Sequence, residues 1–194
     1  MLFKTMLSGL LVISGSTAFA GGWIFDDAHS AADFSVRHMM VTNVKGQMRG
    51  VKGVVDIDDK DLTKSKVDVT LDVGTITTMN PKRDEHLKSP DFLDAQKFPT
   101  IKFVSKKVTK SGDGLTVTGD LTIRGVTKTS ILTVEGPTAP IKDPWGKTKR
   151  GFTATTKVNR KDFGVSWNKA LDGGGVVVGD EVKITIEGEL EEKK

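Results

Sequence analysis

The sequence contains no cysteine among its 194 residues, and this absence removes several classes of protein at once. Disulfide cross-links, thiolate metal sites and thiol nucleophiles are all excluded. A lipoprotein anchor is excluded as well, because its lipid is attached to a cysteine that follows the cleaved leader. The stability of the protein must therefore come from the fold itself.

Long hydrophobic runs are also missing, apart from one at the N-terminus. Residues 1–20 combine Lys4, an apolar run from Leu7 to Ile13 and a small-x-small cleavage site that ends at Ala20. This pattern is typical of a signal peptide, and the run is shorter than the roughly 20 residues of a membrane anchor. We expect cleavage after Ala20, a periplasmic location and one mature domain over residues 21–194.

Charge of one sign is not in large excess. The chain has 29 basic and 25 acidic residues, and loss of Lys4 with the leader leaves 28 against 25, a net charge of +3. So small an excess does not indicate nucleic acid as a partner. A group of lysines between residues 97 and 110 forms either the solvated face of a strand or a surface for transient contact with anionic lipid headgroups. They are Lys97, Lys102, Lys106, Lys107 and Lys110.

Motifs of catalysis and of cofactor binding are missing too. There is no G-x-S-x-G and no P-loop, and Gly173-Gly174-Gly175 precedes a valine-rich strand rather than a helix. The three histidines, His29, His38 and His86, lack the spacing of metal-binding pairs. We therefore expect no enzyme activity, no catalytic residue, no cofactor and no metal.

What the chain does have is period-two alternation of apolar and polar residues almost everywhere after residue 30. One buried and one wet face on each strand is typical of antiparallel sheet, and eight strands suffice to close a barrel without free edges. Gly46, Gly50 and Gly53 interrupt the second strand, where a closing barrel needs a bend or bulge. The expected strands are 31–38, 44–58, 66–76, 100–109, 114–124, 129–136, 151–158 and 181–190.

Helical content is expected to be small and to lie mainly near residues 81–97. Short helices are predicted over 61–64, 81–88, 89–95 and 159–163. For the third, Ser89 is the expected N-cap and Pro90 the first helical residue. The chain then breaks at Pro99 into a strand, so a cluster of Phe92, Leu93 and Phe98 is set over one end of the sheet as a plug or lid.

Five ordered motifs resemble those of the YceI family, and together they extend from about Trp23 to Glu189. They are D-A-H-S at 27–30, F-S-V-R-H at 34–38, H-L-K-S-P-D-F-L-D-A-Q-K-F-P-T-I-K-F at 86–103, G-D-L-T-I-R-G-V-T at 119–127 and N-R-K-D-F-G at 159–164. The resemblance implies an all-β, lipocalin-like eight-stranded antiparallel barrel in the periplasm. It also implies that the interior holds a polyisoprenoid or similar long-chain amphiphile.

Candidate ligand-binding residues follow from the inward parity of the strands together with this resemblance. In a carrier they line a cavity, whereas in an ordinary barrel they fill the core. The apolar set is Phe34, Val36, His38, Phe92, Phe98, Phe103, Leu121, Ile123, Phe152, Phe163 and Trp167. For His38, a hydrogen-bonded core histidine and a polar contact to a ligand headgroup are equally good interpretations.

Three cationic or titratable residues are candidates for a headgroup site at the barrel mouth, namely Arg83, His86 and Arg160. They would hold a phosphate or polar headgroup through charge-assisted hydrogen bonds. The alternative for Arg160 is a structural role in its own turn or with neighbouring groups.

The resulting expectation is non-catalytic binding and transport of a long-chain isoprenoid or other lipid. The rival hypothesis is a solidly packed stress-response or interaction protein that acts through exposed loops. The sequence leaves the oligomeric state open, and a homodimer is one candidate arrangement.

Overall fold

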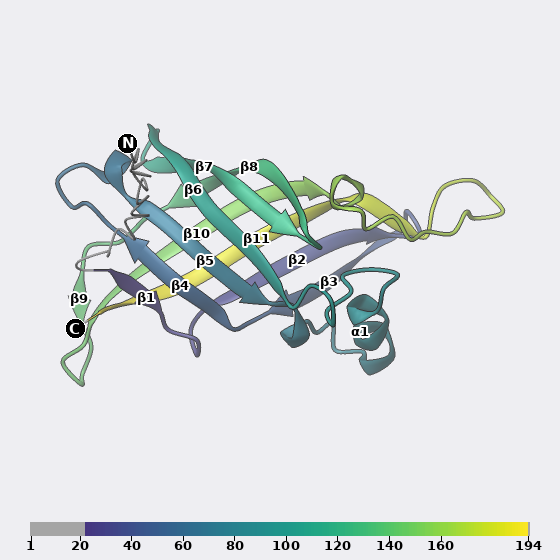
Figure 1. Ribbon diagram of the computed structural model, residues 1–194, viewed down its shortest axis with the longest axis horizontal. Helices are drawn as coiled ribbons and strands as arrows, with labels where there is room; N and C mark the ends of the chain where they lie inside the picture. Colours follow the sequence, from purple (N-terminus) through teal and green to yellow (C-terminus); the bar gives the residue numbers. More distant parts are fainter. Residues whose placement is uncertain (1–21, 194) are drawn as a thin grey trace, which may run out of the picture.

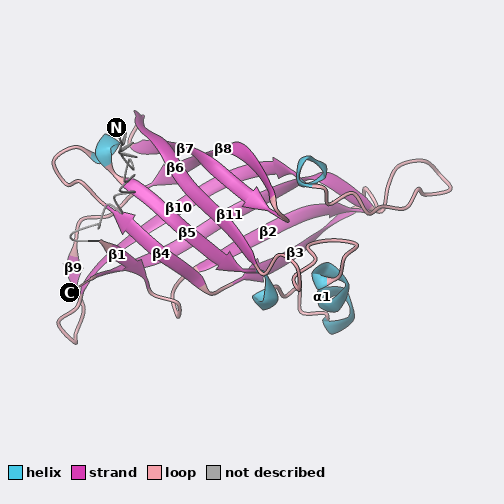
Figure 2. Cartoon of the chain, in the orientation of Figure 1, coloured by secondary structure: helices cyan, strands magenta, loops and turns pink. Residues whose placement is uncertain are grey.

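The computed structural model describes residues 22–193, so the predicted signal peptide and its cleavage site lie outside the described residues. Strands dominate, and the helices are short (Figure 1, Figure 2). Within the described range, no helix is long and apolar enough to cross a membrane. The elements are β1 (Trp23–Phe25), β2 (Ala31–His38), β3 (Thr42–Met48), β4 (Val51–Asp56), η1 (Leu62–Lys64), β5 (Lys66–Asp72), η2 (Val73–Thr75), α1 (Pro81–Lys88), β6 (Thr100–Ser111), β7 (Gly114–Ile123), β8 (Val126–Glu135), β9 (Ile141–Lys142), β10 (Thr148–Asn159), η3 (Arg160–Phe163) and β11 (Val178–Glu192), where η marks a 3-10 helix.

The strands close into an antiparallel barrel with eight strand positions. β1 and β2 share one position, because both pair with the long β11, and β3 and β4 share the next. The ring continues through β5, β6, β7, β8 and β10 and returns to β11, which pairs with β10 from Asn159↔Glu181 to Lys149↔Glu191. The predicted fold class is confirmed.

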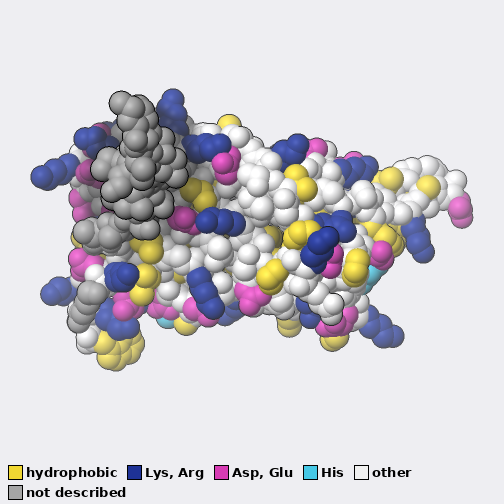
Figure 3. All heavy atoms as spheres, viewed as in Figure 1, with side chains coloured by type: hydrophobic (Ala, Val, Ile, Leu, Met, Phe, Trp, Pro, Cys, Tyr) yellow, Lys and Arg dark blue, Asp and Glu magenta, His cyan; other side chains and the backbone are white. Residues whose placement is uncertain are grey.

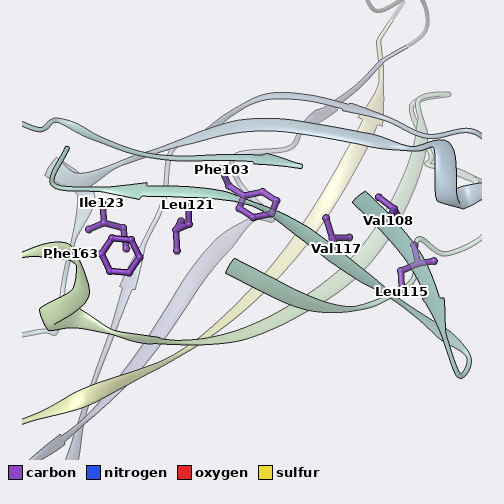
Figure 4. Packing of buried hydrophobic residues seen from close by; sticks show 7 residues of the cluster. All are labelled: Phe103, Val108, Leu115, Val117, Leu121, Ile123 and Phe163. Carbon is purple, nitrogen blue, oxygen red and sulfur yellow. The ribbon is translucent and has the colours of Figure 1, made fainter. Parts of the chain in front are cut away.

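Alternation along the strands places the apolar residues inside the barrel. On β7 the burial alternates without interruption, with Leu115, Val117, Leu121 and Ile123 buried and the threonines between them half-buried. Figure 4 shows these side chains in a row, with Phe103 and Val108 of β6 and Phe163 of η3 on the same inner side. The interior face therefore follows directly from the period-two pattern.

The expected strand over 44–58 is broken into β3 and β4 at Arg49 and Gly50. Gly50 has a φ of 75°, which glycine adopts without steric cost, so the bend falls at one of the glycines that the sequence indicated. On the N-terminal side of this break, β3 lies outside the closed ring of strands. In the described chain it pairs there with β2 alone, apart from one bridge between Gln47 and Thr77.

The helices over 62–64, 81–88 and 160–163 are present, but the expected helix over 89–95 is not. Ser89 is the C-cap of α1 rather than an N-cap, since its N–H donates to the carbonyl of His86 at 3.1 Å. The N–H groups of Leu93 and Ala95 bond back to Leu87 and Lys88. These bonds fold residues 89–97 into successive turns against α1, and a separate helix has no backbone donors left to build it.

Candidate functional site

An apolar cavity runs along the inside of the barrel and extends beneath α1. Its volume is about 310 Å³. At one end it is lined by Phe25, Pro137 and Leu190, and at the other by Leu87, Phe92 and Leu93. All but four of the lining residues are apolar, and the exceptions are Ser65, Thr70, Thr156 and Arg160. The barrel is thus not filled by its own side chains, which counts against the solidly packed alternative.

Three phenylalanine rings lie against inward-facing glycines of a neighbouring strand. A Cβ on Gly46 would stand 2.3 Å from the Phe34 ring, one on Gly119 2.6 Å from Phe103, and one on Gly188 2.4 Å from Phe152. Because glycine has no side chain, each ring can approach the backbone of the wall instead of extending across the lumen. The glycines thereby keep the cavity open.

Most of the apolar candidates from the sequence line this cavity. They are Phe34, Val36, Phe92, Phe103, Leu121, Ile123, Phe152 and Phe163. The sequence analysis missed the inner face of β11, with Val182, Ile184 and Ile186, although its alternation was evident and the same parity argument would have found it. Their role in holding a ligand stays a prediction.

Three of the apolar candidates do not line the cavity. His38 has the inward parity, but it lies at the end of β2, past the closed ring, opposite Val178 and Thr42. Phe98 packs over Gly125 in the β7–β8 turn, with the ammonium of Lys97 5.3 Å from its ring centre. Trp167 packs against Phe92 and His86, with its ring centre 5.2 and 5.1 Å from theirs. The alternation along β2 places His38 on the same face as Phe34 and Val36, but it does not show where the closed ring of strands ends.

Arg160 lies at the α1 end of the cavity and is almost fully buried. Its Nε donates to the carbonyl of Gly179, and its Nη1 donates to those of Val165 and Trp167. Its Nη2 donates to the Val178 carbonyl at 3.3 Å and lies 3.5 Å from Asp180. A guanidinium has five N–H donors, and here backbone carbonyls accept hydrogen bonds from four of them, while the buried Asp180 oxygen beside Nη2 accepts none. These contacts favour the structural alternative for Arg160 over a headgroup contact.

Arg83 and His86 belong to α1 and are engaged with their neighbours. Arg83 donates through Nε to the hydroxyl of Thr78 at 2.7 Å and through Nη2 to its carbonyl at 3.0 Å. His86 lies 2.8 Å from the carboxylate of Asp91, and its ring contacts those of Phe92 and Trp167. Neither residue lines the cavity. His86 and Arg160 do share a neighbour in Trp167, so they lie at the same end of the barrel.

The lid formed by residues 77–99 is held together internally by a buried carboxylate. Asp84 accepts hydrogen bonds from the Thr78 N–H at 2.7 Å and from the hydroxyls of Thr77 and Thr78. Burial alone would raise the pKa of Asp84, but these hydrogen bonds prevail and hold the pKa below its ordinary value. Arg124, in the β7–β8 turn, fastens the lid to the barrel, because it donates to the carbonyls of Pro90 and Gly164.

The opposite end of the barrel is closed by Trp23 and Arg150, both buried. Arg150 lies opposite Leu190, which lines the cavity, and its guanidinium is 4.9 Å from the centre of the Trp23 ring. It pairs with Asp59 at 2.5 Å, and its Nε has no hydrogen-bond partner among the described residues. The cavity is therefore shut at this end by a cation stacked on an aromatic ring.

A cluster of titratable groups on the outer wall was not expected from the sequence. The ligand atoms of Asp26, His29 and Glu189 lie within 4.8 Å of one another, a grouping that could hold a metal ion. However, the buried Lys149 ammonium lies 2.7 Å from Asp26 and 3.0 Å from Glu189. Lys149 thus already supplies a positive charge to these carboxylates.

Four of the five lysines of residues 97–110 lie on β6, and Lys97 precedes this strand. Lys102 pairs with Asp68 of β5 at 3.2 Å, and Lys106 pairs with Asp120 of β7 at 2.6 Å. Figure 3 shows basic and acidic side chains interspersed along the barrel wall on this side. The arrangement favours the solvated strand face over a lipid-docking surface.

A family model described as the YceI-like domain matches residues 23–190. The chain belongs to the YceI family. A UPF0312 protein of Photorhabdus laumondii is 35% identical over 193 residues, which are 97% of this chain and 98% of that protein. A UPF0312 protein of Staphylococcus aureus is 37% identical over 166 residues, which are 86% of this chain and 95% of its own.

Solved structures agree with this assignment. The Campylobacter jejuni YCEI protein has a TM-score of 0.67 at 29% identity, with 97% of this chain and 100% of that chain covered. BcnA of Burkholderia cenocepacia has a TM-score of 0.69 at 24% identity, over 85% of this chain and 98% of its own. A polyisoprenoid-binding domain of Saccharophagus degradans has a TM-score of 0.59 at 11% identity, over 89% and 99%. At 24% and 11% identity, BcnA and the Saccharophagus degradans domain show that the YceI barrel fold is shared.

Proposed function

We propose that this protein acts in the periplasm, where it binds and carries a polyisoprenoid or similar long-chain amphiphile without catalysing a reaction. The observation that carries the proposal is the continuous apolar cavity from Phe25 to Leu93. Its shape and lining suit a long hydrocarbon chain, because pockets of a few hundred Å³ with apolar walls bind ligands mainly by burying apolar surface. A domain of the same fold described as polyisoprenoid-binding supports this ligand class.

The lining also supports binding rather than catalysis. Arg160 is the one ionisable residue among the described residues that line the cavity, and four of its five N–H groups already donate to backbone carbonyls. The carboxylates with lowered pKa values are Asp26, Asp61, Asp84 and Glu191, and none of them lines the cavity. General acid–base or nucleophilic chemistry needs such groups to converge at a ligand.

Transport of a lipid is energetically reasonable for such a cavity. Each CH₂ group that leaves water gains about 0.8 kcal/mol, yet the bilayer from which the lipid comes is just as apolar. Transfer between membrane and cavity is then close to neutral, so the protein can both load and release its ligand. A transient contact with a membrane surface is part of this proposal.

The direct test is native mass spectrometry and lipid extraction of protein isolated from the periplasm of cells that express the full chain. We expect a chain that begins at Gly21 and a bound long-chain lipid that organic solvent releases. Protein that retains residues 1–20 contradicts the proposed processing. Protein that is free of lipid, and does not take up a prenyl lipid from detergent solution, contradicts the carrier function.

A further inference from the structure

The tip of the β2–β3 hairpin exposes three consecutive apolar side chains. Met39, Met40 and Val41 are 44%, 52% and 76% exposed, and they connect His38 to Thr42 at the end of the molecule that also carries α1 (Figure 1). Single exposed apolar residues are common on soluble proteins. A run of three on a projecting turn is uncommon and points to a contact with another apolar phase.

The turn holds this tip in a defined but unfavourable backbone conformation. Met39 and Met40 have φ values of 49° and 60°, a region that glycine and asparagine adopt far more readily than methionine. The N–H of Met39 donates to Val177 at 2.8 Å, and Arg37 donates to the carbonyl of Met40 at 2.8 Å. The two methionines are therefore presented on a braced turn, although better residues for the turn exist.

The apolar lining of the cavity continues toward this tip. Phe34 and Val36 of β2 line the cavity, and Val36 lies opposite Val44 on β3. Val178 of β11 also lines the cavity and lies opposite His38, one residue before the tip. A Cβ on Gly175 would be 3.3 Å from Met40, so the loop between η3 and β11 lies against the tip of the hairpin. The tip is thus joined to the cavity by an apolar strand face.

The hairpin has one acidic residue, Asp33 near the start of β2, and the charge of the part nearer the tip is of one sign. From Phe34 to Val55 the chain has no aspartate or glutamate, whereas it has Arg37, Lys45, Arg49 and Lys52. Arg37 and Lys45 flank the tip and are exposed. This contrasts with the outer wall, where acidic and basic residues alternate, and it complements the anionic headgroups of a bilayer.

We infer that the β2–β3 tip is a membrane-docking element that inserts Met39, Met40 and Val41 into the headgroup region of an anionic lipid bilayer. This inference rests on the proposed carrier function, since docking places the α1 end of the cavity at the membrane. A convex apolar tip with flanking cations fits a bilayer interface, in which apolar burial and attraction to anionic lipids act together. Flexible methionine side chains suit so irregular an environment.

The chain supplies its own matched control at the opposite end. Ile141 and Trp145 are 64% and 83% exposed on the loop that contains β9, which lies at the other end of the barrel from the β2–β3 tip (Figure 1). Asp143 braces that turn by accepting from the N–H groups of Trp145 and Lys147. This second apolar tip is more exposed than the first, but it belongs to the end of the barrel where Trp23 and Arg150 lie.

The experiment measures flotation of the protein with vesicles of phosphatidylethanolamine and phosphatidylglycerol, and with vesicles of phosphatidylcholine alone. Four proteins with the same N-terminus are compared: the parent, Met40→Asn/Val41→Asn, Lys45→Glu, and Ile141→Asn/Trp145→Asn. Asparagine tolerates the positive φ of Met40, and Val41 is 76% exposed, so the tip variant should keep or raise the melting temperature. We expect the tip variant to lose about tenfold or more in affinity for the anionic vesicles. Lys45→Glu should lose several-fold, and the control pair less than about twofold.

The parent should also bind phosphatidylcholine vesicles more weakly, and salt should reduce binding to the anionic ones. Equal binding by parent and tip variant, or a larger loss in the control pair, overturns the inference. Uptake of prenyl lipid from detergent solution is measured on the same proteins, and the tip variant should match the parent. If vesicle binding requires the tip but no protein takes up lipid, docking stands and the carrier function fails. If the proteins take up lipid but vesicle binding does not depend on the tip, the carrier function stands and the docking inference fails.

Discussion

The guanidinium of Arg150 lies 4.9 Å from the centre of the Trp23 ring and closes the barrel at the end opposite α1. Trp23 belongs to the first described strand and Arg150 to β10, so the contact joins distant parts of the chain. Asp59 completes the pair from the loop after β4. The stacking offsets part of the cost of burying a charge whose Nε has no partner in the described chain.

We therefore expect Trp23 and Arg150 to be energetically coupled. In a double-mutant cycle with Trp23→Leu and Arg150→Met, the coupling should be about 1–2 kcal/mol in the free energy of unfolding. Denaturant titrations of the four proteins measure it. A second cycle between Trp23 and Lys102, on the outer wall, is the control. Additive effects for the first pair contradict the stacking account.

Charged residues placed inside the cavity should abolish lipid retention. Phe103 and Ile123 are buried and line the cavity, and an unpaired charge there costs several kcal/mol unless it is neutralised. Phe103→Asp and Ile123→Lys should thus lose co-purified lipid, measured by extraction and mass spectrometry. Thr122→Lys, on the outer face, should retain it. Equal lipid content in folded variants of both kinds contradicts the assignment of inside and outside.

The glycines under the phenylalanine rings offer a way to narrow the cavity without adding charge. The three atoms nearest to a Cβ on Gly188 all belong to the Phe152 ring, two of them at 2.4 and 2.6 Å, so Gly188→Ala should turn that ring into the lumen. We expect weaker binding of long prenyl chains, by about tenfold, with less effect on short ones. Gly151→Ala is the matched control, because its Cβ would meet only Thr138 at 3.8 Å. Titration with prenyl lipids of graded length measures the difference, and equal loss at all lengths contradicts it.

Local patterns predicted the barrel, because alternation depends on each strand alone. Leu115, Val117, Leu121 and Ile123 point inward as their spacing indicates. The predictions that failed concern features formed jointly by segments that are distant in the sequence. Arg160 binds carbonyls of residues 165–179, which no local pattern relates to it, and the place of His38 depends on where neighbouring strands end. The Phe–Gly contacts were likewise hidden, since each joins two strands.

Lys149 should govern how stability depends on pH. The hydrogen bond from Lys149 holds the pKa of Asp26 well below its ordinary value. Burial opposes the charge of Lys149, but the ion pairs with Asp26, Glu189 and Glu191 prevail and raise its pKa. A lowered carboxyl pKa contributes stability above about pH 4 that is lost on acidification, and a raised lysine pKa contributes stability that is lost above about pH 10.

Lys149→Met should consequently lower the free energy of unfolding at neutral pH by about 2 kcal/mol, because three carboxylates then repel one another. The variant should gain stability on mild acidification toward pH 4, where the parent begins to lose it. Lys147→Met is the control, since Lys147 is about half exposed and contacts only Glu191 of this group. Denaturant titrations at a series of pH values compare the three proteins. Parallel pH profiles for Lys149→Met and the parent count against the ion-pair explanation.

Arg160 should act on stability and not on headgroup selection. Its donors hold the carbonyls of Val165, Trp167, Val178 and Gly179, so they join η3, the following loop and β11. Arg160→Lys keeps the charge but cannot span these carbonyls, because an ammonium lacks the planar fork. We expect the variant to lose about 3 kcal/mol in the free energy of unfolding. Affinity for a prenyl phosphate and for an uncharged prenyl alcohol should fall by similar factors. Paired titrations with the two ligands, alongside melting curves, measure both effects. A loss confined to the phosphate ligand, with an unchanged melting temperature, restores Arg160 as a headgroup contact.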